Sequence, residues 1–489
     1  MLPGDSMPNW VRSIVLFYVG LNPSLMRRKM EFEAELQSFR NIQMNVFPFP
    51  YPDEERKSAL AIAYSGDGKL IATTHSSHEV LITNAQTGRL VHTFYRHPRT
   101  PWTVKWHPRD MNLCASGCLG SRLILWDTKS GSSYKDIVVG DKEIVTLDFH
   151  PSQDYLLFGC GDSVYIWDYQ NSTVPQLIIQ KKGYAIISTL FAGGGELLLI
   201  GSRRILNNQE FEDEGRIEEY LLTMEQNSFQ VSKPLLITST SYLVTDRCMS
   251  ISNCGMFLLV AIEAQPKYME PKYYSLSYGP AFDRDYLHLV SEEKKDLSQG
   301  RSFSRIMQQA INGTEGEVVV ESSYQDDGNE QYGVSIAAKC DIGVGQVKKK
   351  LAVLSLDPET KGYVLEFINI RDDVSVVGVD FCKSNNFILL CTENNYPIYE
   401  ENKKVFCAHI RVIQSSTWEI IYEKEFRNAT PNSAVWSPNG CSFSCCLTNG
   451  DIVSFSPMLS LIVCSLHLNM NSLSPDEFCS KWIFVMTRT

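Results

Sequence analysis

The chain has 489 residues, 44% of them apolar and 21% charged, which is the composition of an ordinary globular protein with ample material for a core. Its formal net charge of −11 has the wrong sign for a surface that neutralises nucleic-acid phosphates, so non-specific binding to DNA or RNA is not expected. Length alone would allow two or three average domains, although one repeat architecture can use as many residues.

The N-terminal region contains one apolar stretch, Val11 to Val19, which Arg12 and Ser13 interrupt. The stretch is too short to span a bilayer, and no basic segment precedes it. Neither a membrane anchor nor a secretory signal is therefore expected. The sequence predicts a protein that stays in a reducing compartment.

A helix is predicted next, because Leu25, Phe32, Leu36 and Phe39 follow the spacing of one helical face. Basic residues occupy its first turns and acidic residues its later turns, which opposes the helix dipole. Oppositely charged pairs along the helix recover only about a few tenths of a kcal/mol each. Something outside the helix must hold it, either the rest of the chain or the groove of a partner protein.

Residues 45–59 form a Pro-rich linker that opens with N-V-F-P-F-P-Y-P and cannot be helical. The linker separates an N-terminal arm, residues 1–44, from the domain that follows. We expect an extended segment, and we consider that it pairs with the last sheet of that domain and so closes it.

A signature recurs from Tyr64 onward: an aromatic residue or, once, an isoleucine, then a polar turn, then an apolar run. The seven copies begin at Tyr64, Trp106, Phe149, Phe191, Ile251, Phe381 and Trp436. The first four are 42, 43 and 42 residues apart, the period of a four-stranded WD-repeat blade. The W-D dipeptide itself occurs at Trp126-Asp127 and Trp167-Asp168. The sequence thus predicts an all-β fold, a seven-bladed WD-repeat β-propeller over residues 60–468, preceded by the helical arm.

The later blades are lengthened by additional segments. Blade four carries the acidic run Asn207 to Glu219, expected to be a solvated loop, and blade six an excursion at Glu393–Lys404. Blade five is split by an insertion at about 265–349, whose charge, Gly and Ser content predict a largely mobile loop with one helical turn near Ile306–Ile311. Such insertions usually lie on the rim or one face of a propeller and make contacts there. Residues 469–489 form a tail, in which W-I-F-V-M is either an added strand or a frayed end.

The sequence offers no constellation for catalysis. The G-x-S-x-G, H-E-x-x-H and G-x-x-x-x-G-K-[ST] motifs are absent. His107 and His150 lie in the repeated turn, where a structural hydrogen bond is the expected role. Neither a metal site nor a cofactor is expected, because the cysteines lack matching ligands and several lie inside apolar runs as small hydrophobes, namely Cys114, Cys160, Cys391, Cys445 and Cys446. A non-enzymatic binding platform is favoured over a propeller hydrolase.

Several segments resemble the family of the activating molecule in Beclin-regulated autophagy. They are T-T-H-S-S-H-E-V-L-I-T, H-P-R-T-P-W and L-C-A-S-G-C-L-G near the first two blades, and C-M-S-I-S-N-C-G-M-F-L-L-V-A-I, L-A-V-L-S-L-D-P and N-S-A-V-W-S-P later. That family is a substrate receptor of cullin-RING ubiquitin ligases, joined through the damage-specific DNA-binding adaptor, and a regulator of autophagy initiation. In it a helical arm ahead of the first blade engages the adaptor. The resemblance implies that role for Asn9 to Ile14 and for the helix Leu25–Phe39.

One departure from the family is clear. Its long disordered segment between the two parts of the propeller, which carries many motifs for autophagy partners, is replaced here by shorter insertions, so the chain resembles a short form. A short motif is also ambiguous, since Trp418-Glu419-Ile420-Ile421 fits peptides that bind ubiquitin-like autophagy modifiers and equally fits a buried strand.

The resemblance implies a non-catalytic substrate-recognition subunit of a cullin-RING ubiquitin ligase that also regulates autophagy. The alternative is an autophagy-initiation scaffold without ligase attachment that works through the blade-five insertion. Expected partners are the adaptor and cullin, ubiquitination substrates and autophagy-initiation proteins, in the cytoplasm and also in the nucleus or at autophagosomes. The candidate partner-binding residues are Trp10, Arg12, Ile14, Phe32, Leu36 and Phe39 on the arm, with Arg99 and Trp102 on the ring, where Trp102 could instead belong to the core.

Overall fold

The computed structural model describes residues 32–33, 35–40, 42–50, 57–206, 211–225, 228–263, 319–324, 330–335, 349–358, 360–370, 374–400 and 403–457. The chain divides into two compact units. The larger contains Gln43–Glu270 and Gly343–Ser456, and the smaller contains Met1–Ile42, Pro271–Ile342 and Pro457–Thr489.

Blades one to three are separate four-stranded antiparallel sheets. Blade one has β2 (Ala59–Tyr64), β3 (Leu70–His75), β4 (Glu79–Asn84) and β5 (Leu90–Tyr95). Blade two has β6 (Pro101–Trp106), β7 (Leu113–Cys118), β8 (Arg122–Asp127) and β9 (Ser132–Val138). Blade three has β10 (Ile144–Phe149), β11 (Tyr155–Cys160), β12 (Ser163–Asp168) and β13 (Gln176–Gln180).

Blades four and five are joined into one sheet by a single pairing of Ser241 with Ile262. Blade four has β14 (Tyr184–Ala192), the 3-10 turn η1 (Gly193–Gly195), β15 (Leu197–Ile205), β16 (Phe211–Glu225) and β18 (Leu235–Ser241), with β17 (Ser228–Val231) beside the end of β16. Blade five has β19 (Met249–Ile251), β20 (Phe257–Glu263), β23 (Lys349–Ser355) and β24 (Val364–Asn369).

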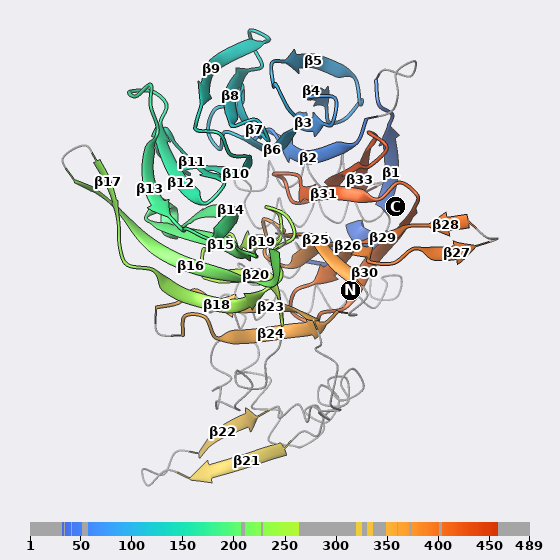
Figure 1. Ribbon diagram of the computed structural model, residues 1–489. Coiled ribbons are helices and arrows are strands. Elements are labelled where there is room, and N and C mark those ends of the chain that lie inside the picture. The colour runs from blue at the N-terminus through green and yellow to red at the C-terminus, as the bar shows by residue number, and fades with distance from the viewer. Residues whose placement is uncertain are drawn as a thin grey trace, which may run out of the picture. The chain divides into compact units, whose positions relative to one another are not determined.

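Blades six and seven complete the ring. Blade six has β25 (Val374–Phe381), β26 (Phe387–Asn394), β29 (Cys407–Gln414) and β30 (Ile420–Arg427), with the small hairpin β27 (Ile398–Glu400) and β28 (Lys403–Val405). Blade seven has β31 (Pro431–Trp436), β32 (Phe443–Leu447), β33 (Ile452–Pro457) and, as its fourth strand, β1 (Ile42–Phe47). Figure 1 shows the first strand of every blade near the common axis, and β31 contacts β2 to close the circle. The predicted seven-bladed β-propeller is confirmed.

The repeated sequence signature ends the first strand of each blade. Tyr64, Trp106 and Phe149 are the last residues of β2, β6 and β10, and the apolar run that follows each turn is the second strand. In several of these turns a residue with positive φ donates the backbone hydrogen bond that closes the turn. One example is Gly68, whose N–H donates to the Ser65 carbonyl at 2.8 Å. Glycine accepts that conformation without strain, which is why the turn is visible in the sequence.

The W-D dipeptide ends the third strand and acts in the turn that follows it. The carboxylate of Asp127 accepts a hydrogen bond from the Lys129 N–H at 2.8 Å, and Asp168 caps the next blade's turn through the Asn171 N–H at 3.0 Å. Asn84 makes the same contact with Thr87 in blade one, at 2.9 Å. A side chain of the Asx type thus fixes the turn between third and fourth strands.

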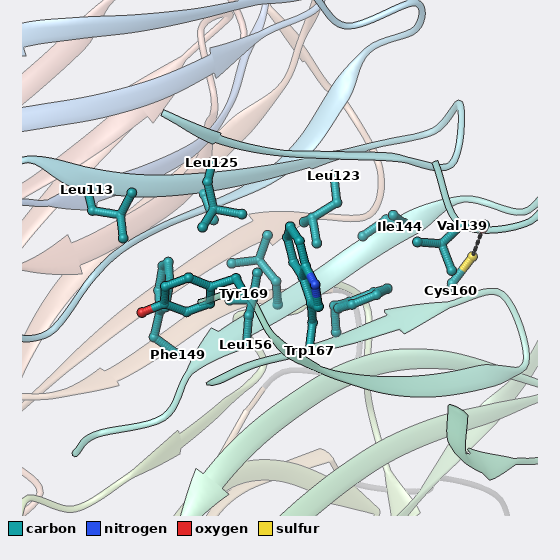
Figure 2. Close-up of a cluster of buried hydrophobic side chains, with 13 residues drawn as sticks. Leu113, Leu123, Leu125, Val139, Ile144, Phe149, Leu156, Cys160, Trp167 and Tyr169 are labelled. Carbon is teal, nitrogen blue, oxygen red and sulfur yellow. Dashed lines mark hydrogen bonds between the residues drawn. The ribbon is translucent and has the colours of Figure 1, made fainter. Parts of the chain in front are cut away.

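The apolar faces of neighbouring blades pack against each other to form the core. Between blades two and three, Leu123 and Leu125 pack in one buried cluster with Phe149, Leu156 and Trp167 (Figure 2). Because both faces of each blade are covered in this way, the strands read as continuous apolar runs in the sequence.

The closing strand lies where the arm and the linker were expected to meet. β1 pairs with β33 and runs from Ile42 to Phe47, so it crosses the boundary placed between residues 1–44 and 45–59. The pairing considered for the linker is therefore made by a segment that begins earlier, in the arm. Its partner strand is about 400 residues away in sequence, and no local pattern identifies it.

The expectation for blade four was wrong. From Phe211 onward the acidic run is not a loop, because Phe211–Glu225 forms the strand β16, while residues 207–210 lie outside the described residues. Glu218 and Glu219 on it are buried, and each forms an ion pair at 2.6 Å, with Lys181 and Lys361 respectively. Lys181 lies in the loop that joins blade three to blade four, and Lys361 lies in a loop of blade five. The charges are thus neutralised by partners that the acidic run itself does not indicate.

The blade-five insertion also contains structure that was not expected. β21 (Val319–Tyr324) and β22 (Glu330–Ser335) pair as an antiparallel hairpin. The sequence carried the signal, since β-formers flank Asp327-Gly328, a common hairpin turn. The helical turn expected at Ile306–Ile311 and the tail at 469–489 lie outside the described residues.

Candidate interaction surface

The histidines of the ring are structural. The Nδ1 atom of His107 accepts the Asp110 N–H at 2.7 Å, and that of His150 accepts the Gln153 N–H at 3.0 Å. Burial lowers the pKa of both imidazoles, so each remains a neutral hydrogen-bond acceptor. This is the role expected for both residues.

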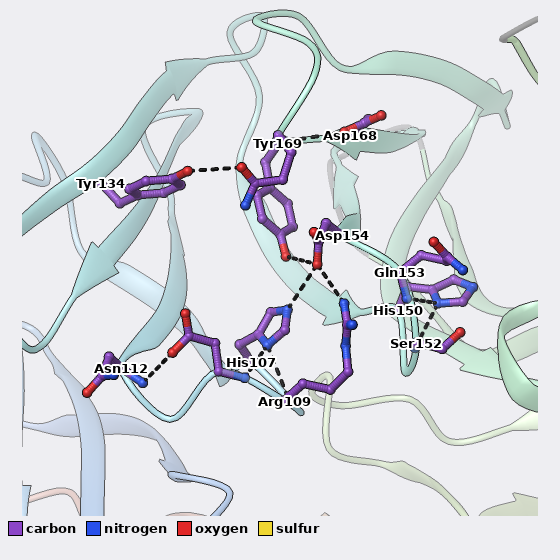
Figure 3. A network of polar contacts seen from close by, with 12 residues as sticks. His107, Arg109, Asn112, Tyr134, His150, Ser152, Gln153, Asp154, Asp168 and Tyr169 are labelled. Atoms are coloured by element: carbon purple, nitrogen blue, oxygen red, sulfur yellow. Dashed lines mark hydrogen bonds and ion pairs between the residues drawn. The ribbon is translucent and has the colours of Figure 1, made fainter.

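A polar network on blades two and three connects these turns (Figure 3). Asp154 accepts hydrogen bonds from Arg109 Nη2 at 2.6 Å and from the Tyr169 hydroxyl at 3.3 Å. Since Tyr169 is buried and Arg109 comes from the neighbouring blade, the network ties blade two to blade three. It is organised to hold turns together and contains no activated nucleophile.

The described part of the chain contains neither a cluster of metal ligands nor a reactive thiol among the cysteines discussed above. No group of three or more His, Cys, Asp or Glu side chains there could hold a metal ion. The cysteines expected to be hydrophobes are all buried, and burial raises the pKa of Cys160 to about 11 and of Cys446 to about 12. These thiols stay protonated at neutral pH and serve as core residues.

One face of the ring carries the features that fit a binding surface. Because strands within a blade are antiparallel, the loops from second to third strands lie on the same face as those that lead into each first strand. We call it the start face. It includes the turn 119–121, the segment 96–100 before β6, and the corresponding loops of the other blades.

Three additions to the blades occur on the start face, whereas the β16–β17 hairpin of blade four lies on the opposite one. The connection between β15 and β16, the insertion between β20 and β23, and the β27–β28 hairpin each follow a second strand. Glu263 and Lys349 are paired across β20 and β23, so the two ends of the insertion leave the ring side by side. On the β27 side of blade six, Tyr396 is 73% exposed. Blades four, five and six thus present extra chain on one shared face.

The two candidate residues of the ring also lie on the start face. Trp102 is 37% exposed at the beginning of β6, and it is therefore not a core residue. Arg99 is exposed three residues earlier and donates from Nη1 to the Leu119 carbonyl at 3.3 Å. The register of β6 against β7 skips Trp102, which marks a β-bulge. Equivalent skips occur at Leu60, Val145 and Ile187, so the bulge is a repeated feature of the first strands.

The candidate residues of the arm are only partly described. Trp10, Arg12 and Ile14 lie outside the described residues. Residues 32–33 and 35–40 are helical, with Phe32 and Leu36 half-buried and Phe39 only 1% exposed. Glu35 and Ser38 are buried as well, while Glu33, Gln37 and Arg40 are exposed, so the buried side of the helix is not limited to the predicted apolar residues. A side chain as buried as Phe39 can reach a partner only after whatever covers it has moved.

The ambiguous Trp418 motif is structural. The Trp418 indole N–H donates to Glu366 on β24 of blade five at 3.0 Å, and the ring packs on a core cluster between blades five and six. Trp418 adopts a positive φ of 58° in the turn before β30, an uncommon conformation for a bulky residue. A peptide in this conformation is not the extended strand that such a motif requires.

The sequence reasoning missed Asp246 and Arg247, which lie in the loop before β19. Arg247 donates to the Ile62 carbonyl at 2.8 Å and to the Val104 carbonyl at 3.4 Å. The sequence signal was a charged pair before an apolar run. Such a pair also occurs in ordinary loops, so it does not identify a residue that reaches across the ring.

Comparisons with known proteins agree with the fold. The family model described as the anaphase-promoting complex subunit 4 WD40 domain matches residues 31–109. The crystal structure of the Cps50 (Swd1) β-propeller domain of Myceliophteria thermophila superposes with a TM-score of 0.51 at 12% identity, covering 85% of this chain and 99% of that one. A likeness at this identity shows the fold alone.

Two zebrafish proteins, activating molecule in BECN1-regulated autophagy proteins 1A and 1B, are each 37% identical over 118 residues, 24% of this chain. The match covers only 9% and 8% of those relatives, so the chain spans less than a tenth of their length. The Arabidopsis transcriptional corepressor LEUNIG_HOMOLOG is 27% identical over 125 residues, 24% of this chain and 16% of that protein. Among the described residues, no helix is long and apolar enough to cross a membrane. The chain is a WD-repeat β-propeller with curated homologues named for BECN1-regulated autophagy.

Proposed function

We propose that this protein is a non-catalytic substrate-recognition subunit of a cullin-RING ubiquitin ligase with a role in autophagy. The observation that carries the proposal is the similarity to the autophagy proteins, joined to a ring whose described residues are organised for contact and not for catalysis. In the proposal the arm recruits the adaptor and cullin, and the start face presents the ubiquitination substrate.

The connection between arm and ring supports a division of labour. Since β1 is the fourth strand of blade seven, the arm enters the propeller through a strand of the ring itself. An adaptor bound to the arm would be connected to the ring through β1. The start face is the proposed site of a second partner.

The proposal is tested by affinity purification with mass spectrometry of the full chain. Leu36→Asp places a charge on the half-buried side of the arm helix, and Gln37→Asp adds the same charge at an exposed neighbour as a matched control. We expect adaptor and cullin to co-purify with the native chain and the Gln37 variant and to be lost with the Leu36 variant. Absence of both proteins from the native chain would refute ligase attachment.

The substrate side is tested separately. Arg99→Glu reverses the charge of an exposed residue on the start face, and Lys129→Glu makes the same reversal at an exposed turn on the opposite face. We expect the Arg99 variant to lose substrates while keeping the adaptor, and the Lys129 variant to keep both. Thermal unfolding of each variant shows that the ring is intact.

A second candidate function is an autophagy-initiation scaffold that works through the blade-five insertion. The observation in its favour is that the ends of the insertion leave the start face as a pair, Glu263 with Lys349. Replacing residues 271–342 by a short Gly-Ser linker would remove the partners of a scaffold but leave those of the arm. Co-purification of autophagy proteins with this variant would exclude the insertion as their site.

A further inference from the structure

The loop Thr245–Cys248, here called the axial segment, joins blade four to blade five and contacts blade six. The Thr245 hydroxyl donates to the Val377 carbonyl at 2.7 Å, and the Val379 N–H donates to the Arg247 carbonyl at 2.8 Å. Cys248 Sγ lies 3.3 Å from the Val376 carbonyl. These contacts join blade five to its neighbour in the ring, as an ordinary connecting loop can.

Other bonds of the axial segment reach back to blade four and across the ring to blades one and two. Asp246 accepts from the Thr103 hydroxyl of blade two at 2.9 Å through its carboxylate, and from Ser188 of blade four at 3.0 Å through its carbonyl. Arg247 Nη2 donates to the Ile62 carbonyl of blade one and the Val104 carbonyl of blade two. Blades one and two lie across the ring from blade five, so these side chains must pass through the axis.

The first strands around the axial segment supply further charged groups. Lys105 on β6, Asp148 on β10 and Asp380 on β25 all lie within electrostatic reach of Arg247. The carboxylates also link neighbouring blades, since Asp148 accepts the Phe191 N–H at 2.9 Å and Asp380 accepts the Trp436 N–H at 3.1 Å. The axis is therefore a polar centre and not an apolar core.

We infer that the axial segment is a second closure of the ring, built from inside and independent of the strand β1. The first closure is the pairing of β1 with β33 at the outer edge of blade seven. The second ties blades one, two, four and six to the loop before blade five through hydrogen bonds, several of them made by buried or partly buried charged groups. Such bonds are stronger than neutral ones and are unfavourable to leave unmade.

The consequence is that β1 can be released without opening the propeller. A strand at the edge of a sheet is the least protected one, and β1 continues directly from the arm. A partner that pulls on the arm can therefore displace β1 while blades one and two stay attached across the axis. This inference concerns the ring and does not depend on which partner the arm takes.

The test compares hydrogen–deuterium exchange in full-length variants. Met44→Pro with Asn45→Pro releases β1, because alternate amides of a paired strand face the neighbour and one of two consecutive prolines must remove a ladder donor. Arg247→Met removes the guanidinium bonds to blades one and two while keeping the aliphatic length. Arg411→Met is the matched control, since among the described residues its side chain bonds to Glu423 and Thr392 within blade six.

With the two prolines alone, we expect faster exchange in β1 and β33 while β2 and β6 stay protected. Adding Arg247→Met should raise exchange in β2 and β6 at least about tenfold, because the lost bonds to a charged group shift the opening equilibrium by that order. Adding Arg411→Met should leave β2 and β6 unchanged. If the prolines alone expose β2 and β6 as fully as the combination does, the inference is overturned.

A milder variant covers the case in which the combination does not fold. Thr103→Val removes the hydroxyl donor to Asp246 and keeps the side-chain shape. In the proline background it should raise exchange in β6 above that of the prolines alone. Equal exchange in the two proteins would count against the second closure.

Discussion

The indole N–H of Trp126 donates to Ser116 Oγ at 2.7 Å, so the third strand of blade two is bonded to its second strand through side chains as well as backbone. The same Ser116 Oγ lies 2.6 Å from Nε2 of His97, which lies in the loop before β6, the first strand of blade two. Phe94 stacks on Trp126 with ring centroids 4.5 Å apart. One buried tryptophan thus links strands of blade two to the loop that precedes it.

Replacing Trp126 by Phe removes this donor and retains an aromatic ring on Phe94. We expect the free energy of unfolding to fall by about 2 kcal/mol, because the Ser116 hydroxyl loses its indole donor and a small cavity remains. Urea unfolding monitored by circular dichroism measures the change. Trp102→Phe on the exposed start of β6 is the control and should have a clearly smaller effect; an equal effect would contradict the role assigned to Trp126.

The stability of the ring should decrease as the pH falls from 7 to 5. Burial lowers the pKa of His97 to about 3, with the nearby Arg122 adding to the effect, and burial lowers the pKa of His75 to about 4. Both values lie below the ordinary 6.5, so the unfolded chain binds more protons in between and stability rises with pH across that window. Each histidine should contribute about 1.4 kcal/mol per pH unit once the pH is well below 6.5.

Urea unfolding of the native chain and of His97→Gln at several pH values between 5 and 7.5 checks this expectation. The variant should show a shallower dependence on pH, since it lacks one of the buried histidines. His78→Asn, an exposed histidine in a left-handed turn, serves as the control because asparagine accepts the same backbone conformation. Parallel pH curves for the native chain and the His97 variant would argue against the assignment.

The closing strand should be sensitive to the size of residue 88. A Cβ added at Gly88 would lie 2.3 Å from Phe47 Cδ1 on β1, and Gly88 also has a φ of +70°. Gly88→Ala should therefore lower the free energy of unfolding by about 2–4 kcal/mol, from backbone strain and from displacement of Phe47. Hydrogen exchange of β1 should rise in the same variant.

Gly140→Ala provides the comparison that separates the two effects. Gly140 has a φ of +72°, but nothing lies within 4 Å of an added Cβ, so only the backbone strain applies. It should lower stability by about 1–2 kcal/mol and leave β1 unaffected. The prediction fails if the two variants behave alike.

Lys181 and Glu218 form an ion pair that joins the loop before β14 to β16, with Nζ and Oε2 2.6 Å apart. The Tyr220 hydroxyl donates to the same carboxylate oxygen at 2.8 Å. Burial acts to raise the pKa of Glu218, but Lys181 and Tyr220 outweigh it and hold the pKa below its usual value. Removing one partner leaves the other charge buried and alone.

Glu218→Gln should therefore destabilise the ring by about 3 kcal/mol, and the double variant Lys181→Met with Glu218→Leu should be less destabilised than either single apolar replacement. A double-mutant cycle from urea unfolding measures the coupling. The pair of Lys142 with Asp162, in which the lysine side chain is 49% exposed, is the control and should show weaker coupling. Equal coupling in the two pairs would mean that burial does not decide their strength.

Much of the ring could be read from the sequence because its information is local. A first strand ends at an aromatic residue such as Trp106, a turn follows within a few residues, and an Asx residue such as Asp127 caps the next turn. These contacts join residues close in sequence, so each copy of the repeat displays them without reference to the rest of the chain. The roles of His107 and His150 were predictable for the same reason.

Long-range contacts account for what the sequence left open. The acidic run at Glu218 and Glu219 predicts a loop because charge usually means solvent, whereas Lys181 and Lys361 neutralise it from loops distant in sequence. Trp102 could have been core or surface, and only the packing of β6 exposes it.

By itself the sequence determined the number of blades, the ends of their first strands and the turns between them, because the apolar runs and the turn chemistry that mark them act over a few residues. Only the tertiary structure decided that β1 completes blade seven and that Arg247 reaches Ile62 across the axis. The residues in that last contact are separated by 185 positions. Closing a ring depends on which distant surfaces meet, and no short-range pattern encodes that choice.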